Sequence, residues 1–399
     1  MMNNMTLSIE NAVVVCGDDL VPGGAVDVAA GRIVAIRKPG EKAARPADVR
    51  VDARGACLAP GFIDLHIHGL HEFLVDNGPE HLAAIAKLLP RYGVTGWLPT
   101  LSPRPRGEDS RLLATLSQAR TSGAAILGFH LEGPFLALMG ALPPEALGNC
   151  DAARVEALMA AAAPHPAVFS ISPEVPGVAE FIPLMHRDGA AVFITHTRAS
   201  VRQTQIAIEA GARHATHFYD VFPVPPETDG GVRPCGVVEA VLADPRVTVD
   251  FILDGVHVDP VAVQMALECK GPGGVCLVTD AMVGAGCAPG RHFFGGEEVE
   301  FLAPGAPARM TENSRKPGGL AGSGLTLNLA VRNAMRLAGT TLPQAVRMAS
   351  ANPARVLGLE DKLGSIAVGR SADLVLLDDK VDVIQTWVAG ESVYRKGEA

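Results

Sequence analysis

Residues 128–135 read GFHLEGPF, and this stretch marks the end of a buried strand in the middle of the chain. An apolar run over residues 124–131 leads to Glu132, which is followed at once by Gly133 and Pro134, two residues that interrupt regular structure. A carboxylate at the end of a buried strand is costly to leave unpaired, so it should meet a cation or several hydrogen-bond donors. Glu132 is therefore our first candidate metal ligand, although the motif alone also fits a glutamate that caps the next helix.

The sequence around this stretch alternates between apolar strand candidates and Ala- and Leu-rich helical patterns. Eight strands alternating with helices predict an α/β fold with a (β/α)8 TIM barrel, which we place at residues 59–358. Gly- and Pro-rich stretches at residues 223–234 and 287–319 predict irregular segments. Helical patterns cover residues 81–89, 152–163, 201–210 and 325–337. The strand candidates are residues 61–68, 93–101, 124–132, 167–174, 191–196, 214–218, 247–254 and 275–280.

Both ends of the chain show another pattern, in which apolar and polar positions alternate in short pieces. The pattern covers residues 5–58 and returns over residues 364–394, and it is typical of antiparallel strands. We infer that both termini build one small β-sandwich domain, with the barrel inserted between its two parts. The predicted parts are residues 1–58 and 359–399.

Composition limits the classes of function. The 399 residues are 48% apolar and 19% charged, and the net charge of -9 argues against nucleic acid as a partner. No apolar run approaches the ~20 residues that a membrane span needs. The seven cysteines include no CxxC pair, which indicates reduced thiols rather than disulfides or a thiolate zinc site. Because the first residues also lack a signal-peptide pattern, we expect a cytoplasmic location.

Ionisable residues end most of the predicted strands, and in a barrel enzyme the chemistry gathers at these carboxyl ends. Two histidines separated by one residue, as in the first strand, place both imidazoles on one face. Each of these histidines, taken singly, could be a hydrogen-bonded interior residue. Together, so many titratable groups would need an unusual network unless they bind a metal. In chain order they are His66 and His68, Glu132, His196, His217, Asp254 with His257, and Asp280.

The types of residue indicate which metal and which chemistry to expect. Imidazoles and a carboxylate without thiolates favour zinc or another divalent transition ion over calcium or magnesium. Asp280 suits a general base that takes a proton from water activated by the metal, and its alternative role is to cap the following turn. The pattern therefore predicts a divalent metal centre of one or two ions, with Asp280 beside it.

Motifs spread over nearly the whole chain carry a family resemblance. They are PGFIDLHIHG (60–69), FHLEGPFL (129–136), ATHFYD (215–220), DGVH (254–257), LVTDAM (277–282), LAGSGLTL (320–327), NPARVLGL (352–359), GSIAVGRSADLV (364–375) and VAGESVY (388–394). In this order they resemble the amidohydrolase superfamily, and within it the deacetylases of amino-sugar phosphates. The end of the fourth predicted strand reads Ser172-Pro173-Glu174, without the lysine that marks the carboxylated-lysine branch of that superfamily.

The resemblance implies roles for individual residues. For the metals and the proton transfer, they are Glu132, His196 and His217 at the main ion, His66 and His68 at a second ion bridged by Glu132, and Asp280 as catalytic acid and base. His257 matches a residue that contacts the sugar or the amide carbonyl. Arg233 matches a phosphate-binding arginine, and from the sequence it could equally be a solvated loop charge. The loop beside the sugar is implied to be Leu320, Ala321 and Gly322.

Three positions near the implied substrate site depart from the family pattern. Leu142 stands where the family usually has a histidine, which removes a polar contact. Asp220 and Val221 stand where asparagine and alanine are usual, and an aspartate facing a phosphate would repel it unless only its backbone N–H is used. These departures leave the reaction class intact and leave the identity of the sugar open.

The implied activity is the metal-dependent hydrolysis of the N-acetyl group of N-acetylglucosamine 6-phosphate to glucosamine 6-phosphate and acetate. The alternatives are a deacetylase of another amino sugar, such as N-acetylgalactosamine 6-phosphate or an unphosphorylated sugar, and a catalytically silent binding protein. The resemblance also implies a homodimer in which a loop of one subunit helps to complete the site of the other.

Overall fold

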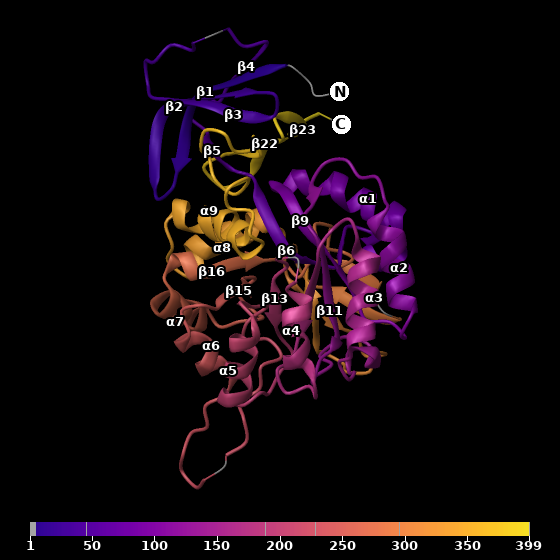
Figure 1. Cartoon of the computed structure of the whole chain (residues 1–399). Coiled ribbons are helices and arrows are strands. Elements are labelled where there is room, and N and C mark those ends of the chain that lie inside the picture. The colour runs from indigo at the N-terminus through magenta and orange to yellow at the C-terminus, as the bar shows by residue number, and fades with distance from the viewer. Residues whose placement is uncertain (1–4, 45, 188, 228, 295, 399) are drawn as a thin grey trace.

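The computed structural model describes residues 5–44, 46–187, 189–227, 229–294 and 296–398. A parallel barrel surrounded by helices forms the larger body, and a sheet that contains both ends of the chain lies against one side of it (Figure 1). None of the helices described is both long enough and apolar enough to span a membrane.

The barrel strands follow one another in chain order around the ring. Their residues are buried on both faces, as in the fully buried strand β9, which is typical of parallel strands covered by helices. The ring closes where the Asp280 N–H donates to the His66 carbonyl over 2.9 Å. The strands are β6 (Phe62–Ile67), β9 (Val94–Leu101), β11 (Phe129–Phe135), β12 (Ala167–Ile171), β13 (Val192–Ile194), β14 (His214–Ala215), β15 (Thr248–Ile252) and β16 (Val275–Val278), with the short β10 (Ala125–Ile126) beside β9.

Helices cover the outside of the barrel (Figure 1). Local sequence sets several of their starts: α5 begins after a capping box between Ser200 and Gln203, and the Asp259 carboxylate caps α7. The α-helices are α1 (Pro79–Leu88), α2 (Glu108–Ser117), α3 (Ala152–Ala162), α4 (Val178–Met185), α5 (Val201–Ala210), α6 (Val237–Ala243), α7 (Pro260–Lys270), α8 (Leu327–Leu337), α9 (Leu342–Ala349) and α10 (Ala351–Val356). Short 3-10 helices are η1 (Val75–Asn77), η2 (Leu89–Tyr92), η3 (Pro144–Ala146) and η4 (Pro272–Gly274).

The predicted barrel is confirmed. Each of the eight predicted strand regions overlaps one strand of the ring, the region 124–132 also covering the short β10, and the helix expected at residues 325–337 is α8. The helices expected at residues 81–89, 152–163 and 201–210 are α1, α3 and α5.

The second sheet joins the two ends of the chain, as the sequence predicts. Its central pairing is antiparallel between β5 and β21, where Leu58 lies opposite Leu376. A separate apolar core, with Ile9 and Trp387 fully buried, packs against this sheet. Its strands are β1 (Thr6–Cys16), β2 (Asp19–Ala29), β3 (Arg32–Arg37), β4 (Val49–Asp52), β5 (Cys57–Pro60), β21 (Leu374–Leu377), β22 (Val383–Val388) and β23 (Glu391–Arg395).

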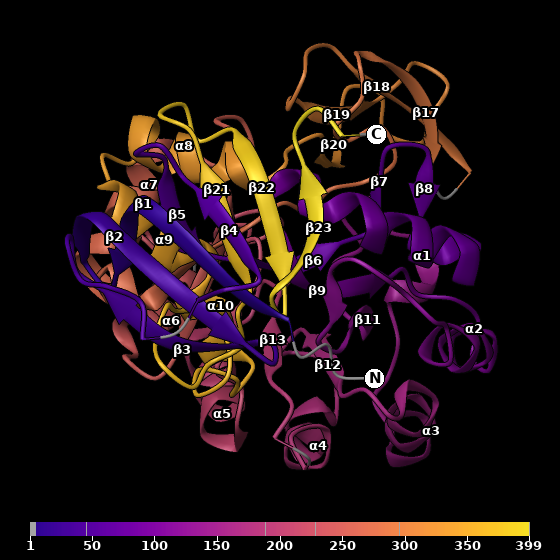
Figure 2. The same cartoon turned by 90° about the horizontal axis from the view of Figure 1, so that it is seen from above.

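The prediction of an irregular segment at residues 287–319 is wrong. Strands β17 (Gly290–Phe294), β18 (Glu297–Phe301) and β19 (Pro307–Met310) lie there, and with β20 (Leu320–Ser323) they form an antiparallel sheet, visible beside the short strands β7 (Gly69–Leu70) and β8 (Phe73–Leu74) in Figure 2. The reason is a period-two apolar pattern at Val299 and Phe301 that the Gly and Pro residues around it obscure. The described part of residues 223–234 lies outside helices and strands, in a loop that projects from the barrel in Figure 1.

Candidate active site

The carboxylate of Glu132, at the carboxyl end of the barrel, lies between four imidazoles. Its Oε1 is 3.0 Å from His217 Nε2 and 3.2 Å from His196 Nε2. Its Oε2 is 2.9 Å from His68 Nε2 and 3.5 Å from His66 Nε2. All five side chains are buried, so the two oxygens of Glu132 join two histidine pairs.

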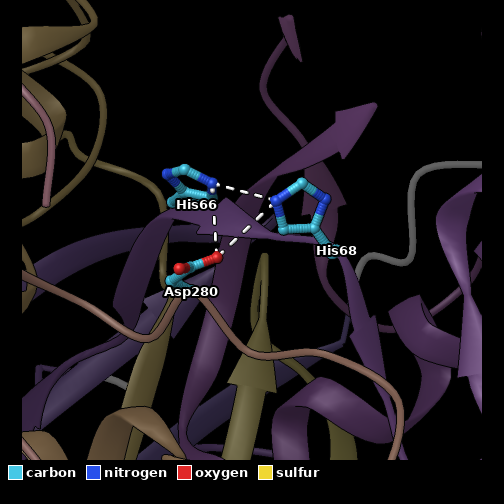
Figure 3. Close-up of side chains that lie close together, drawn as sticks. All are labelled: His66, His68 and Asp280. Atoms are coloured by element: carbon cyan, nitrogen blue, oxygen red, sulfur yellow. Dashed lines mark hydrogen bonds and ion pairs between the residues drawn. The ribbon is translucent and has the colours of Figure 1, made fainter. Parts of the chain in front are cut away.

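Asp280 completes the group from the end of β16. Figure 3 shows its carboxylate facing His66 and His68, with Oδ1 at 3.4 Å and 3.6 Å from their Nε2 atoms. The two Nε2 atoms are themselves 3.2 Å apart. The structure therefore brings together the six residues that the sequence nominated for the metals and for proton transfer.

The separations between these ligand atoms fit divalent metal binding. A tetrahedral zinc ion with bonds of about 2.0–2.1 Å has neighbouring ligand atoms about 3.3–3.4 Å apart. Two overlapping groups have ligand atoms within 4.8 Å of one another, namely His66, His68 and Asp280, and His66, Glu132 and His217. The two groups overlap at His66, and the Glu132 oxygens lie within 3.5 Å of all four imidazole Nε2 atoms, so two adjacent positions beside Glu132 could each hold an ion.

Three of the imidazoles are oriented through their other ring nitrogen. His196 Nδ1 donates to the Leu138 carbonyl over 2.9 Å, and His217 Nδ1 donates to the Asp220 carbonyl over 3.3 Å. His66 Nδ1 lies 3.3 Å from Thr216 Oγ1. Such bonds fix the tautomer that leaves the Nε2 lone pair free for a metal, as is usual for histidine ligands.

The charges of Glu132 and its histidines also favour the binding of a cation. Burial raises the pKa of Glu132, but the nearby His66, His196 and His217 lower it by more than burial raises it, so that the pKa of Glu132 lies well below its usual range. Burial lowers the pKa of His217, yet its hydrogen bond with Glu132 raises that pKa to about 10. The ionised Glu132 therefore attracts protons onto the imidazoles, and a divalent cation would supply the same charge in their place.

The backbone at three of these positions has an unusual conformation. The φ values are 48° at His196, 34° at His217 and 46° at Asp280, in the left-handed region that residues other than glycine seldom adopt. Each residue lies two positions after the end of its strand, where this turn directs the side chain toward the mouth of the barrel. Strain of this kind is concentrated at functional sites.

A buried carboxylate below the metal group, Asp250, was missed by the sequence reasoning. Its Oδ1 accepts the His217 backbone N–H and, over 3.2 Å, the Thr216 hydroxyl that contacts His66. Its Oδ2 accepts a bond from His214 Nε2 over 2.7 Å. Asp250 thus connects β14 and β15 to two of the candidate ligands.

Two further buried groups, His130 and Asp64, were also missed. His130 lies two residues before Glu132, contacts Ser170 Oγ over 2.6 Å, and meets the His66 ring edge to face at 4.4 Å. Asp64 lies two residues before His66 and accepts the Thr279 hydroxyl over 2.7 Å. Burial raises the pKa of Asp64 to about 7. Their spacing from the ligands is the signal that could have found them, because alternate residues of a strand share a face.

A pocket of about 330 Å³ opens above the metal group. Met282, Phe294 and Met310 give it an apolar wall, two of these residues coming from the small antiparallel sheet. Most of the residues nominated for substrate binding lie on its surface, namely Leu142, Asp220, Val221, Leu320, Ala321 and Gly322.

Two nominated residues, His257 and Arg233, are not among the residues that line this pocket. The His257 side chain is buried, its Nδ1 donates to Asp254 over 2.7 Å, and its Nε2 has no hydrogen-bond partner among the described residues. Burial lowers the pKa of His257, while Asp254 and, more weakly, Asp220 raise it, with a net rise. The Arg233 side chain is 71% exposed and pairs with Glu239 over 2.9 Å beside a separate cavity. Arg233 therefore does not reach the pocket of its own chain.

Comparisons with known proteins agree on the family. The amidohydrolase family profile matches residues 57–393. The chain is 35% identical to an N-acetylgalactosamine-6-phosphate deacetylase of Escherichia coli O157:H7, covering 88% of this chain and 91% of that protein. It is 31% identical to an N-acetylglucosamine-6-phosphate deacetylase of Danio rerio, covering 88% and 87%. The chain belongs to the amidohydrolase family.

A solved structure supports the same assignment. The crystal structure of N-acetylglucosamine-6-phosphate deacetylase from Pasteurella multocida matches with a TM-score of 0.86 and 29% identity, covering 97% of this chain and 99% of that one. The family resemblance drawn from the sequence motifs is thus confirmed. As an amidohydrolase, the protein is a hydrolase that acts on an amide, and its His, Asp and Glu groups are suited to a divalent metal.

Proposed function

We propose that this amidohydrolase removes the acetyl group of N-acetylglucosamine 6-phosphate and releases acetate and glucosamine 6-phosphate. The observation that carries the proposal is the Glu132 carboxylate between two histidine pairs, with Asp280 opposite, at the floor of the 330 Å³ pocket. The names of the relatives support the substrate class.

We further propose that the metal is zinc, bound by Glu132, His196 and His217, with a second position at His66 and His68. A zinc ion held there would polarise the amide carbonyl and lower the pKa of water. Nitrogen ligands with a carboxylate and no thiolate support zinc over magnesium or calcium.

Asp280 is the proposed acid and base of the reaction. Its Oδ1 takes the proton of the attacking water and then gives it to the leaving nitrogen, so that one carboxylate serves both steps. His257, held by Asp254, has a buried Nε2 without a partner among the described residues, and we propose that it donates a hydrogen bond to the substrate.

N-acetylgalactosamine 6-phosphate is the second candidate substrate, because the relative with 35% identity bears that activity in its name. The two sugars differ only at the 4-hydroxyl, so the pocket must distinguish them by one polar contact. A silent binding protein is disfavoured, because a module that only binds has no need of Asp280 beside a full set of ligands.

We also propose an oligomeric state, a location and domain boundaries. Val224 and Val232, 68% and 56% exposed on the projecting loop, support the proposed homodimer through that loop. Seven unpaired cysteines support the proposed cytoplasmic location. The proposed domain boundaries near residues 58 and 358 lie close to the end of β5 at Pro60 and the end of α10 at Val356.

The test is acetate release by the zinc-supplemented protein from N-acetylglucosamine 6-phosphate, its 4-epimer and both unphosphorylated sugars. We expect N-acetylglucosamine 6-phosphate to be hydrolysed with the highest kcat/KM. Preference for the 4-epimer would select the second candidate. Equal rates on phosphorylated and unphosphorylated sugars would contradict the proposed phosphate specificity.

A further inference from the structure

The residues that line the pocket have an imbalance of charge. Glu132, Asp220 and Asp280 contribute carboxylates to it, and Lys316 is the one Lys or Arg side chain among the described residues that line it. The proposed metal would offset Glu132 and Asp280, but Asp220 lies outside the metal group and would repel a phosphate unless a cation faced it. Within one chain the nominated positions do not provide this cation, since Leu142 is apolar and Arg233 pairs with Glu239 on the projecting loop, from which it could serve only the pocket of a partner subunit.

We propose that Lys316 holds the anionic group of the substrate and so determines specificity for a sugar phosphate. The proposal rests on the function proposed above and names a residue for which neither the motifs nor the relatives provide a role. Lys316 lies in the connection between β19 and β20, outside the sequence motifs that carry the family resemblance.

The position of Lys316 is defined by a contact across the mouth of the pocket. Its Nζ donates to the Gly140 carbonyl over 3.1 Å. Gly140 in turn lies against His196, because a Cβ built on Gly140 would be 2.6 Å from His196 Cε1. The carbonyl oxygen and the Cβ position of one residue are about 3 Å apart, so the ammonium lies within about 9 Å of the His196 ring.

This upper limit is compatible with the dimensions of the proposed substrate. With bonds of about 1.5 Å, the acetyl carbonyl carbon and the phosphorus of a hexosamine 6-phosphate are about 8 Å apart across the sugar ring. An amide at the metal group would therefore place the phosphate near Lys316. The ammonium has three N–H donors, so it can keep its bond to Gly140 and still donate to two phosphate oxygens.

The neighbouring Arg315 provides a matched control. Its Nε pairs with Glu297, and its backbone N–H donates to the same carboxylate over 3.0 Å. Arg315 is absent from the pocket lining, so Arg315→Met removes the same charge one residue away without removing the proposed contact.

The experiment compares wild type with Lys316→Met, Lys316→Arg, Arg315→Met and Arg233→Met. Steady-state kinetics are measured on the phosphorylated and unphosphorylated N-acetylhexosamine, and binding of glucosamine 6-phosphate is measured by calorimetry. We expect Lys316→Met to lower kcat/KM for the phosphorylated sugar at least tenfold more than for the unphosphorylated one, mainly through KM. Lys316→Arg should restore most of this loss, and Arg315→Met should resemble wild type.

The outcomes separate this inference from the function on which it rests. Equal losses on both sugars, no loss in Lys316→Met, or a selective loss in Arg233→Met alone would overturn the role of Lys316 while leaving the deacetylase activity intact. If wild type releases no acetate from either sugar, the proposed function fails. In that case, glucosamine 6-phosphate binding that weakens at least tenfold in Lys316→Met still supports Lys316 as the anion-binding residue, and unchanged or absent binding refutes it.

Discussion

Replacing Asp250 with alanine removes the carboxylate that supports two candidate metal ligands from below. In the native protein this carboxylate accepts hydrogen bonds from the His217 backbone, from His214 Nε2 and from Thr216 Oγ1. The alanine leaves these buried donors without an acceptor. The Thr216 hydroxyl also loses the partner that fixes its contact with His66.

The expected magnitude follows from counting those donors. An unsatisfied buried donor costs about 1–3 kcal/mol, and the backbone N–H and the imidazole N–H cannot turn toward other acceptors. We therefore expect Asp250→Ala to lower the free energy of unfolding of the metal-free protein by about 2–6 kcal/mol. Asp250→Asn is the control, because its amide oxygen can still accept the His217 N–H and its NH2 can donate to the other tautomer of His214; we expect a loss below about 1.5 kcal/mol.

Urea unfolding in excess chelator measures this loss, and zinc content after gel filtration measures the effect on the ligands. We expect zinc affinity to fall about 10- to 100-fold in Asp250→Ala, because a support of the histidine ligands is lost. An Asp250→Ala protein within about 1 kcal/mol of wild type, or one that keeps its full zinc content at the same affinity, would refute the supporting role.

Three further predictions concern the metal group and the pocket. Asp280→Asn should retain zinc, since its Oδ1 stays near His66. Its kcat should fall at least about 100-fold, because the amide cannot accept a proton from water. Near-native turnover would refute the role of Asp280 as acid and base. The pKa of His217 is about 10, above the ordinary 6.5, so His217 carries a proton in the metal-free protein at neutral pH. Zinc must displace that proton, so zinc affinity should rise about tenfold per pH unit for each displaced proton between pH 6.5 and 10. A zinc affinity that does not change with pH in competition titrations would contradict this. Gly140→Ala should displace His196, because the added Cβ would lie 2.6 Å from its Cε1 and φ there is +57°; we expect lower zinc content with the fold retained by circular dichroism, and unchanged content would contradict the contact.

The strand ends were the part of the site that the sequence could predict. Each ligand follows an apolar run, and in a parallel barrel all such ends meet on one face whatever the details of packing. The positions of Glu132, His196, His217 and Asp280 therefore follow from local pattern and chain order alone.

The support beneath the ligands could not be predicted in the same way. His214 and Asp250 lie on β14 and β15, and their bond depends on the register that sets His214 opposite Thr248. Nothing local in either strand fixes that register. Period-two spacing did offer a signal for Asp64 and His130, which share a strand face with His66 and Glu132.

The wall of the pocket could not be predicted from the sequence for another reason. Its apolar residues Phe294 and Met310 belong to the small antiparallel sheet, whose short strands are separated by Gly and Pro and resemble loops in sequence. Lys316 reaches the pocket only because that sheet folds over the end of the barrel and brings it to Gly140. Conversely, Arg233 fits the family motif but pairs with Glu239.

The central claim is that Glu132 and its histidines hold a metal needed for amide hydrolysis. The most direct measurement removes bound metal with a chelator, assays acetate release from N-acetylglucosamine 6-phosphate, and then titrates zinc back while counting bound ions. We expect the metal-free protein to be inactive and its activity to return in proportion to one or two zinc ions bound per chain. Full activity in protein shown to contain no metal would contradict it.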